Sequence, residues 1–131
     1  MIGLDTNVLL RHVAQDDPVQ SPRASALIED RLTEEEPGFV SVVTLAETAW
    51  VLDRVYRYPH DQIAAVIERF LQIRTLIVEN EREVFLAMTM LKQGRADFTD
   101  LLIGVLGARA GCSTIMTFDR KAARLPGFTL A

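Results

Sequence analysis

The sequence lacks several features that would point to an exported or membrane-bound protein. Cys112 is the only cysteine among 131 residues, so an internal disulfide cannot form and a metal site built from thiolates is excluded. No apolar run approaches the roughly 18 residues that a membrane span needs. The N-terminus carries no charged leader or cleavage site. We therefore expect a cytoplasmic protein that does not associate with a membrane.

An excess of basic charge is also missing. The chain has 14 Lys and Arg against 18 Asp and Glu, which gives a formal net charge of −4. A protein that coats nucleic acid is usually basic, so this balance counts mildly against bulk phosphate binding. Divalent cations held by acidic residues reverse the local charge, however, so this composition does not exclude a nuclease.

The glycine motifs of common nucleotide-binding sites are absent as well. Neither a GxxxxGK[ST] loop nor a GxGxxG fingerprint occurs in the sequence. Cys112 follows Gly111 just before an apolar run and has no histidine nearby. This context favours a buried thiol over a nucleophile.

What is present is the pattern of a folded α/β protein, with 49% hydrophobic and 24% charged residues. Short apolar runs that predict strands alternate with longer segments of helical periodicity. Such alternation implies right-handed crossovers and a mainly parallel sheet covered on both faces. We expect one three-layer α/β/α domain over residues 1–131. The predicted strands lie at 1–4, 39–43, 76–78, 113–118 and 128–130, and the main helices follow Asp17, Val43, Pro59, Asn80 and Asp97.

Two aspartates come directly after predicted strands, where ligands of parallel sheets bind. Asp5 ends the first apolar run and Asp119 ends the Ser113–Phe118 run. Either aspartate could instead cap the segment that follows it. Asn7 could support the carboxylate of Asp5 or simply shape the turn.

Glu47 lies inside a predicted helix with Val43, Trp50 and Val51 at helical spacing. A carboxylate in apolar surroundings is costly unless it is paired or bound to a metal. The alternative is an exposed glutamate, or one paired with Arg54.

Asp97 and Asp100 are three residues apart at the start of one predicted helix. Asp97 could be the N-cap, and Asp100 would then benefit from the helix dipole. Asp100 also shares a helix face with Gly104 and Gly107, and glycines allow a backbone or a ligand to approach closely. We interpret this face as favouring a functional role for Asp100.

A parallel sheet could bring these strand ends and helix starts together. Three or four converging carboxylates are what Mg²⁺ or Mn²⁺ sites require, since both ions prefer hard oxygen ligands. Such a cluster can activate water and neutralise charge on a phosphodiester. A phosphatase or phospho-receiver domain also places aspartates at strand ends, but the motif here is Asp5-Thr6-Asn7 rather than Asp-x-Asp.

Four segments together resemble the PIN-domain family, and within it the VapC toxin class. They are MIGLDTNVLLRHVAQDDP, SVVTLAETAWVL, GRADFTDLLIGVLGARAGC and TFDRKAARLPGF, which occur in the family's order over nearly the whole chain. The resemblance implies a PIN fold and an endoribonuclease that depends on Mg²⁺ or Mn²⁺. The four acids that it implies are Asp5, Glu47, Asp100 and Asp119.

The resemblance also implies supporting residues and partners. Asp97 matches an additional acid, and Thr6, Asn7 and Thr117 match polar positions that support the acids. The implied partners are an RNA substrate, a VapB-like antitoxin and a second copy in a homodimer. A PIN-like module that binds RNA or protein without cutting it is the alternative.

Two further predictions concern surfaces. Basic residues near the acids in sequence could form a rim that guides phosphates, or could simply be solvated; these are Arg11, Arg95, Arg120, Lys121 and Arg124. Two helices also carry more apolar residues than one small domain readily buries, and we expect part of that surface to serve an interface. They are Trp50, Val51 and Val55, then Ile63, Val66, Ile67 and Phe70.

Overall fold

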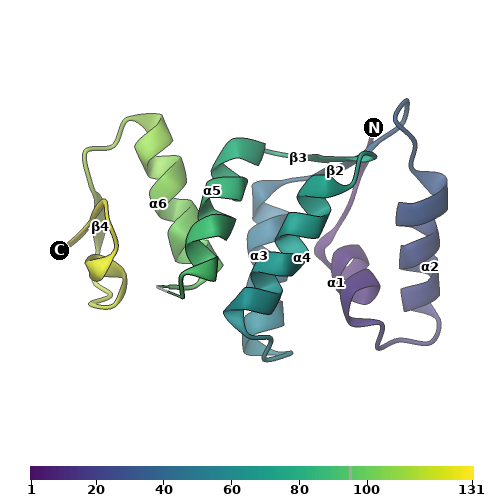
Figure 1. Cartoon of the computed structure of the whole chain (residues 1–131), viewed down its shortest axis with the longest axis horizontal. Coiled ribbons are helices and arrows are strands. Elements are labelled where there is room, and N and C mark those ends of the chain that lie inside the picture. Colours follow the sequence, from purple (N-terminus) through teal and green to yellow (C-terminus); the bar gives the residue numbers. More distant parts are fainter. Residues whose placement is uncertain (95) are drawn as a thin grey trace.

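The computed structural model describes residues 1–94 and 96–131, so Arg95 of the expected basic rim lies outside the described residues. Helices and short strands alternate along the chain (Figure 1). The strands are β1 (Ile2–Gly3), β2 (Gly38–Val40), β3 (Leu76–Val78), β4 (Ile115–Thr117) and β5 (Phe128–Leu130). The α-helices are α1 (Thr6–Ala14), α2 (Gln20–Ala26), α3 (Val42–Arg54), α4 (His60–Gln72), α5 (Glu81–Lys92) and α6 (Phe98–Ala110). A π-helical turn, η1 (Leu27–Arg31), extends α2, and a 3-10 turn, η2 (Ala122–Arg124), lies between β4 and β5.

Local side-chain chemistry explains where α3 begins, one or two residues earlier than expected, and where α6 begins and ends. Ser41 caps α3 by accepting a hydrogen bond from the Thr44 amide at 3.1 Å. Asp97 caps α6 in the same way, which is one of the roles that the sequence left open for it. Gly111 ends α6 in the left-handed conformation, with φ of 94°, which glycine adopts at no steric cost.

All paired strands are parallel, which confirms the predicted α/β class. β2 lies between β1 and β3, with Gly38 opposite both Ile2 and Leu76. β4 and β5 form a separate two-stranded sheet with Ile115 opposite Phe128. The described strands are therefore divided between two sheets rather than joined in one central sheet.

The core is built from the apolar faces of the helices and from β2 and β3. Ile63, Val66, Ile67 and Phe70 of α4 are all buried, so the expected exposure of that helix is wrong. Burial of each such side chain contributes about 1.5–3 kcal/mol.

In contrast, α3 retains exposed apolar side chains. Trp50 and Val55 are 50% and 64% exposed, whereas Leu45, Ala49 and Leu52 on the same helix are buried. One face of α3 is therefore buried in the core, and its outer face also carries exposed apolar side chains.

The molecule is long in one direction. In Figure 1, α1 and α2 lie at one end, the β4–β5 pair lies at the other, and α3 to α6 lie between them. Within the described part of the chain, the helices are too short or too polar to cross a membrane. The accessible surface is 7743 Å², compared with about 6,900 Å² for a compact monomer of this mass.

Candidate functional site

Asp5 lies just after β1, at the start of α1. Its backbone is extended, and its carbonyl oxygen accepts hydrogen bonds from the amides of Val8 (3.1 Å) and Leu9 (3.4 Å). In the described structure its side chain makes no capping hydrogen bond to the helix. The alternative of a capping aspartate therefore does not hold for Asp5, and its carboxylate is exposed to solvent.

Glu47 projects from the middle of α3. Its Oε1 accepts a hydrogen bond from the hydroxyl of Thr6, and the Thr6 side chain is buried. Of the two interpretations of Glu47 left open by the sequence, the exposed glutamate is the one observed, because Glu47 is exposed and neighbouring Val43 is 74% exposed. Arg54, the suggested partner, instead contacts Asp97.

Asp5 and Glu47 line the same cavity, which has a volume of about 480 Å³. We call this pair of acids the β1 group. Thr6, Asn7 and Arg11 line the cavity as well, so it combines two carboxylates with a hydroxyl, an amide and a guanidinium. Arg11, a member of the expected basic rim, therefore lies beside these acids.

A polar network holds Arg11 at the edge of this cavity. Its guanidinium lies 3.3 Å from Asp16 Oδ1, and its Nε donates to Gln20 at 2.9 Å. Tyr56 donates a hydrogen bond to Asp16 Oδ2 at 2.7 Å, and this bond, reinforced by Arg11, lowers the pKa of Asp16. Nothing in the sequence separated Tyr56 from the other aromatic residues, and only the fold brings it to Asp16.

Three further aspartates lie at the start of α6 and the end of β4, and we call Asp97, Asp100 and Asp119 the β4 group. Asp97 Oδ1 accepts from the Asp100 amide at 2.9 Å, and Asp97 Oδ2 lies 3.8 Å from Arg54 Nη2. Burial raises the pKa of Asp100, and the negative charges of Asp97 and Asp119 raise that pKa further. These three acids therefore interact electrostatically.

Asp119 performs the capping role that the sequence left open. Its Oδ1 accepts hydrogen bonds from the amides of Lys121 (2.8 Å) and Ala122 (3.3 Å). Its own amide donates to Thr117 Oγ1 at 3.0 Å. Thr117 thus supports the backbone of Asp119, and the exposed carboxylate can still be reached by a ligand.

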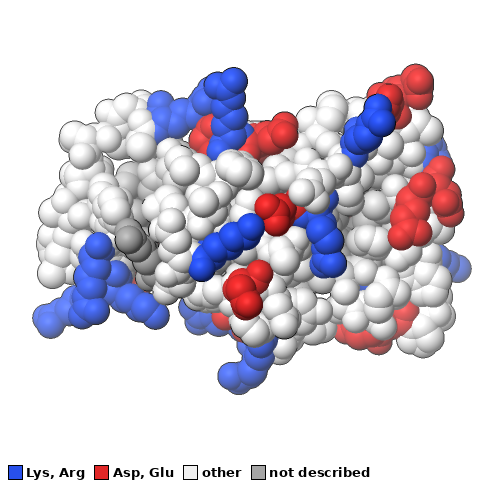
Figure 2. Space-filling model, viewed as in Figure 1, with Lys and Arg blue, Asp and Glu red and all other residues white. Residues whose placement is uncertain are grey.

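Basic side chains gather near this end of the chain. Arg120, Lys121 and Arg124 are exposed around η2, which follows Asp119. Figure 2 shows Lys and Arg side chains clustered at the lower left, where η2 lies in Figure 1. A phosphate approaching the β4 group from this side would meet positive charge first.

The glycine face of α6 is occupied by the β4–β5 pair. A Cβ on Gly104 would lie 2.7 Å from Phe128 Cε1, and one on Gly107 would lie 2.2 Å from Ile115 Cδ1. The predicted close approach is confirmed, but the approaching groups are side chains of the protein itself. The glycines therefore give no separate support to a role for Asp100 in binding a ligand.

The candidate acids have the ligand chemistry that a hard divalent cation needs. Their spacing, however, does not fit a single ion. Carboxylates are the ligands that Mg²⁺ and Mn²⁺ prefer. Among the described residues, however, no three His, Cys, Asp or Glu side chains lie close enough to hold one ion. The end of the molecule that carries β4 is also well separated from the N-terminus that leads into β1 (Figure 1). The expected convergence of all four acids is therefore not observed among the residues that the structure describes.

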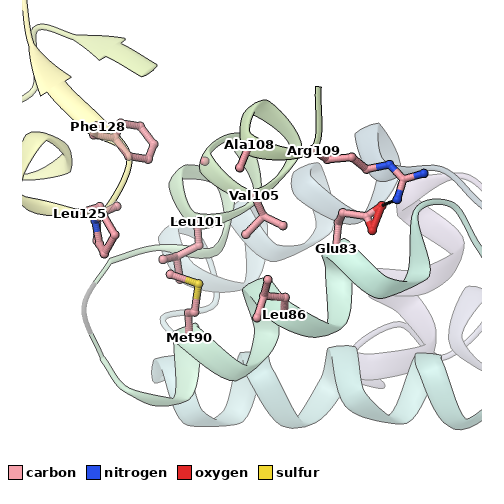
Figure 3. A pocket seen from close by; sticks show the side chains of 11 residues that line it. Glu83, Leu86, Met90, Leu101, Val105, Ala108, Arg109, Leu125 and Phe128 are labelled. Carbon is pink, nitrogen blue, oxygen red and sulfur yellow. Dashed lines mark ion pairs between the residues drawn. The ribbon is translucent and has the colours of Figure 1, made fainter. Parts of the chain in front are cut away.

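A second hollow lies between α5, α6 and the segment that leads into β5 (Figure 3). It measures about 350 Å³, and Leu86, Met90, Val105 and Phe128 give it apolar walls. At one end, Glu83, which is only 7% exposed, pairs with Arg109 at 3.0 Å. This groove could not be predicted from the sequence, because its walls come from three separate segments.

Cys112 follows Gly111 at the end of α6 and is exposed. The interpretation of Cys112 as a buried thiol is therefore wrong. The apolar run that follows it forms β4 of the two-stranded sheet instead of a core strand.

Comparison with known proteins gives one family. The PIN domain family matches residues 2–127, which include all the candidate acids. No curated protein and no solved structure matches the chain significantly.

Proposed function

Because this chain belongs to the PIN domain family, whose members are generally metal-dependent nucleases, we propose that it is an endoribonuclease that requires Mg²⁺ or Mn²⁺. We further propose that it serves as the toxin of a type II toxin–antitoxin pair of the VapC class. The proposed reaction is hydrolysis of an RNA phosphodiester bond that leaves a 3′-hydroxyl and a 5′-phosphate.

The observation that carries the proposal is the β1 group. Asp5 and Glu47 share one cavity although they come from different elements of the fold. Asp5 does not cap its helix, and Thr6 holds Glu47 by a hydrogen bond. Two carboxylates that share a cavity beside the carboxyl end of a parallel strand suit an oxygen-liganded cation.

We assign the ligand role to Asp5, Glu47, Asp100 and Asp119, with Asp97 assisting. A bound divalent cation would supply the positive charge that lets an acidic site accept a phosphodiester. Thr6 orients Glu47, Thr117 fixes the backbone of Asp119, and Asn7 faces the same cavity as Asp5. Arg11, held by Asp16 and Tyr56, offers a positive charge at the cavity's edge.

The apolar groove between α5 and α6 supports the proposed antitoxin partner (Figure 3). An amphipathic helix could place apolar side chains against Leu86, Met90 and Val105. An acidic or basic residue of that helix would meet the Glu83–Arg109 pair at the end of the groove.

The alternative function is an inactive PIN-like module that binds RNA or protein. The observation in its favour is the spacing of the acids, because the described side chains do not form a cluster that could hold one ion. The two functions differ in whether RNA is cut, and mutation of Asp5 distinguishes them.

The test is cleavage of a mixed RNA substrate by the purified chain with Mg²⁺, with Mn²⁺ and with excess EDTA. Asp5→Asn should lower cleavage at least about 100-fold, since loss of groups that merely support a metal ligand already costs about 10–100-fold. Asp30→Asn, a change at an exposed residue of η1, is the matched control and should retain full activity. Full activity of folded Asp5→Asn, or unchanged cleavage in EDTA, would exclude the proposed mechanism.

A further inference from the structure

A small cavity lies between α1 and α2, which stand side by side at one end of the molecule (Figure 1). Its volume is about 300 Å³, at the lower end of the roughly 300–1,000 Å³ that small-molecule sites span. Residues at helical spacing form the wall on each side. They are Asn7, Val8 and Arg11 of α1 with Gln20, Arg23 and Ala24 of α2.

This α1–α2 cavity adjoins the cavity of the β1 group. Asn7 and Arg11 line both cavities, so a ligand that extends from one into the other passes these two side chains. The two cavities differ in charge. Asp5 and Glu47 line the first, whereas none of the acids that the structure describes lines the second.

Arg11 is held in place and still has donors to offer. Its Nε donates to Gln20 Oε1 at 2.9 Å, and its Nη1 donates to Asp16 Oδ1 at 3.3 Å and to the Tyr56 hydroxyl at 3.4 Å. A guanidinium has five N–H groups, so the two on Nη2 remain for a ligand. Because the side chain is already ordered, binding a ligand costs it little conformational entropy.

Gln20 and Arg23 add further donors at the rim of the cavity. An arginine nitrogen can only donate, so the side-chain oxygen of Gln20 faces Arg11 and its NH₂ group is left for another acceptor. Arg23 is exposed, and none of the ion pairs between described residues involves it. The nearby carboxylate of Asp17 is engaged in the backbone of α2, since its Oδ1 accepts from the Gln20 amide at 2.7 Å.

The floor of the cavity is apolar. Ala24 is buried, and Val8 and Leu27 are half-buried beside it. An apolar floor beneath a rim of donors matches a nucleotide, because the base has a flat face and the phosphate accepts charged hydrogen bonds. A partner helix is about 10–12 Å wide and needs a longer apolar strip. The cavity therefore suits a nucleotide better than a helix.

We propose that the α1–α2 cavity is a subsite for single-stranded RNA, which binds the nucleotide next to the one held at the β1 group. Arg11 contacts the phosphate between the two nucleotides, because it borders both cavities. Arg23 and Gln20 bind the far side of the nucleotide in the subsite, and its base lies against Val8 and Leu27. RNA as the ligand rests on the proposed function, whereas the subsite itself requires neither metal nor cleavage.

Binding of oligouridylates of increasing length tests the subsite. Fluorescence anisotropy in EDTA measures affinity while the proposed reaction is blocked. Wild-type affinity should rise in a step at the length that first reaches the α1–α2 cavity. In Arg23→Gln this step should be lost, which weakens binding of the longer RNAs about tenfold, as for the loss of one charged hydrogen bond. RNAs too short to reach the cavity should bind both proteins equally.

Two further variants make the test specific to this cavity. Arg31→Gln removes the same charge from η1, where Arg31 pairs with Glu36 at 2.6 Å, and it should keep the step. Ala24→Met fills the floor of the cavity and leaves every charge in place, so it should lose the step. Circular dichroism checks the folding of each variant. If Ala24→Met does not fold, Arg23→Gln decides, because it changes only an exposed side chain.

Three results would overturn the subsite. The first is a step in affinity that survives in Arg23→Gln. The second is a loss of affinity that is the same at every RNA length or the same in Arg31→Gln, since this would be a general effect of charge. The third is a partner protein whose binding is lost in Arg23→Gln while RNA binding is unchanged, which would assign the cavity to a protein segment.

A cleavage assay separates failure of the subsite from failure of the proposed function. If the chain shows the step but never cuts RNA, the nuclease proposal fails and the subsite stands. If the chain cuts RNA and the step is absent, the subsite fails and the nuclease proposal stands. In an active enzyme Arg23→Gln should raise KM more than it lowers kcat, because the subsite binds substrate and transition state alike.

Discussion

The hydroxyl of Thr6 donates a hydrogen bond to Glu47, a residue 41 positions further along the chain. This contact joins the first turn of α1 to the middle of α3. The Thr6 side chain is buried while Glu47 is exposed, so a fixed donor orients an acid at the surface. The pair links the Asp-Thr-Asn motif to the second acid of the β1 group.

Thr6→Val should lower RNA cleavage while the protein stays folded. Valine has nearly the shape of threonine but cannot hold Glu47, and loss of such a supporting group costs about 10–100-fold in activity. Thr6→Ser restores the hydroxyl and should recover most of the rate. Steady-state cleavage of a fluorescent RNA measures both variants, and equal rates for valine and serine would show that the hydrogen bond does not matter.

Asp100→Asn should stabilise the protein near neutral pH in the absence of metal. The folded-state pKa of Asp100 is raised, first by burial and then by Asp97 and Asp119, so its charge opposes folding once it forms. The gain should be below about 1 kcal/mol, because Asp100 is partly solvated and solvent screens the repulsion. Urea unfolding in EDTA at about pH 7 measures it.

The pH dependence of this gain in stability follows from the direction in which the pKa of Asp100 is shifted. A raised folded pKa means that stability is lost as pH rises from the ordinary value for aspartate through the raised one. The advantage of Asp100→Asn should therefore vanish below the ordinary pKa of aspartate, where both states are protonated. An advantage that persists at low pH would assign the effect to packing.

Gly107→Ala should weaken the attachment of the β4–β5 pair to α6. The added methyl group would lie 2.2 Å from Ile115 Cδ1, and such overpacking costs about 1–3 kcal/mol, more than the roughly 1 kcal/mol gained in helix propensity. The double variant Gly107→Ala with Ile115→Val lacks the clashing Cδ1 and should regain stability. Urea unfolding of both single variants and the double variant gives the coupling energy, and additive effects would exclude this contact.

Replacing Arg120 and Lys121 together with alanine should weaken RNA binding and make it less dependent on salt. Each lost contact with a single-stranded phosphate lowers the slope of log affinity against log salt by about 0.7. The control replaces Arg74 and Lys92, which pair with Glu34 and Glu68 away from the acids. Fluorescence anisotropy at several salt concentrations separates the two variants, and identical slopes would remove Arg120 and Lys121 from the RNA path.

The sequence was sufficient for those parts of the fold that depend on local chemistry. Asp97 and Gly111 mark the two ends of α6, because a capping carboxylate and a left-handed glycine act within one helical turn. The positions of β1 and β4, and of Asp5 and Asp119 after them, follow from short apolar runs. None of these features requires knowledge of distant contacts.

The sequence does not predict that the strands divide between two sheets. A strand's composition shows that it can pair, but its partner is chosen by tertiary packing. Here Ile115 and Phe128 pack onto α6, which keeps β4 away from β1. The sequence indicated Asp100 by its glycine neighbours, although these glycines in fact accommodate the strand pair.

The placement of the two acid groups at separate sheets has a consequence for metal loading. Among the described residues no three acids lie close enough to hold one ion, so a cation bound to either group alone would keep most of its water ligands. The occupancy of such an ion should follow the concentration of free cation in the solution.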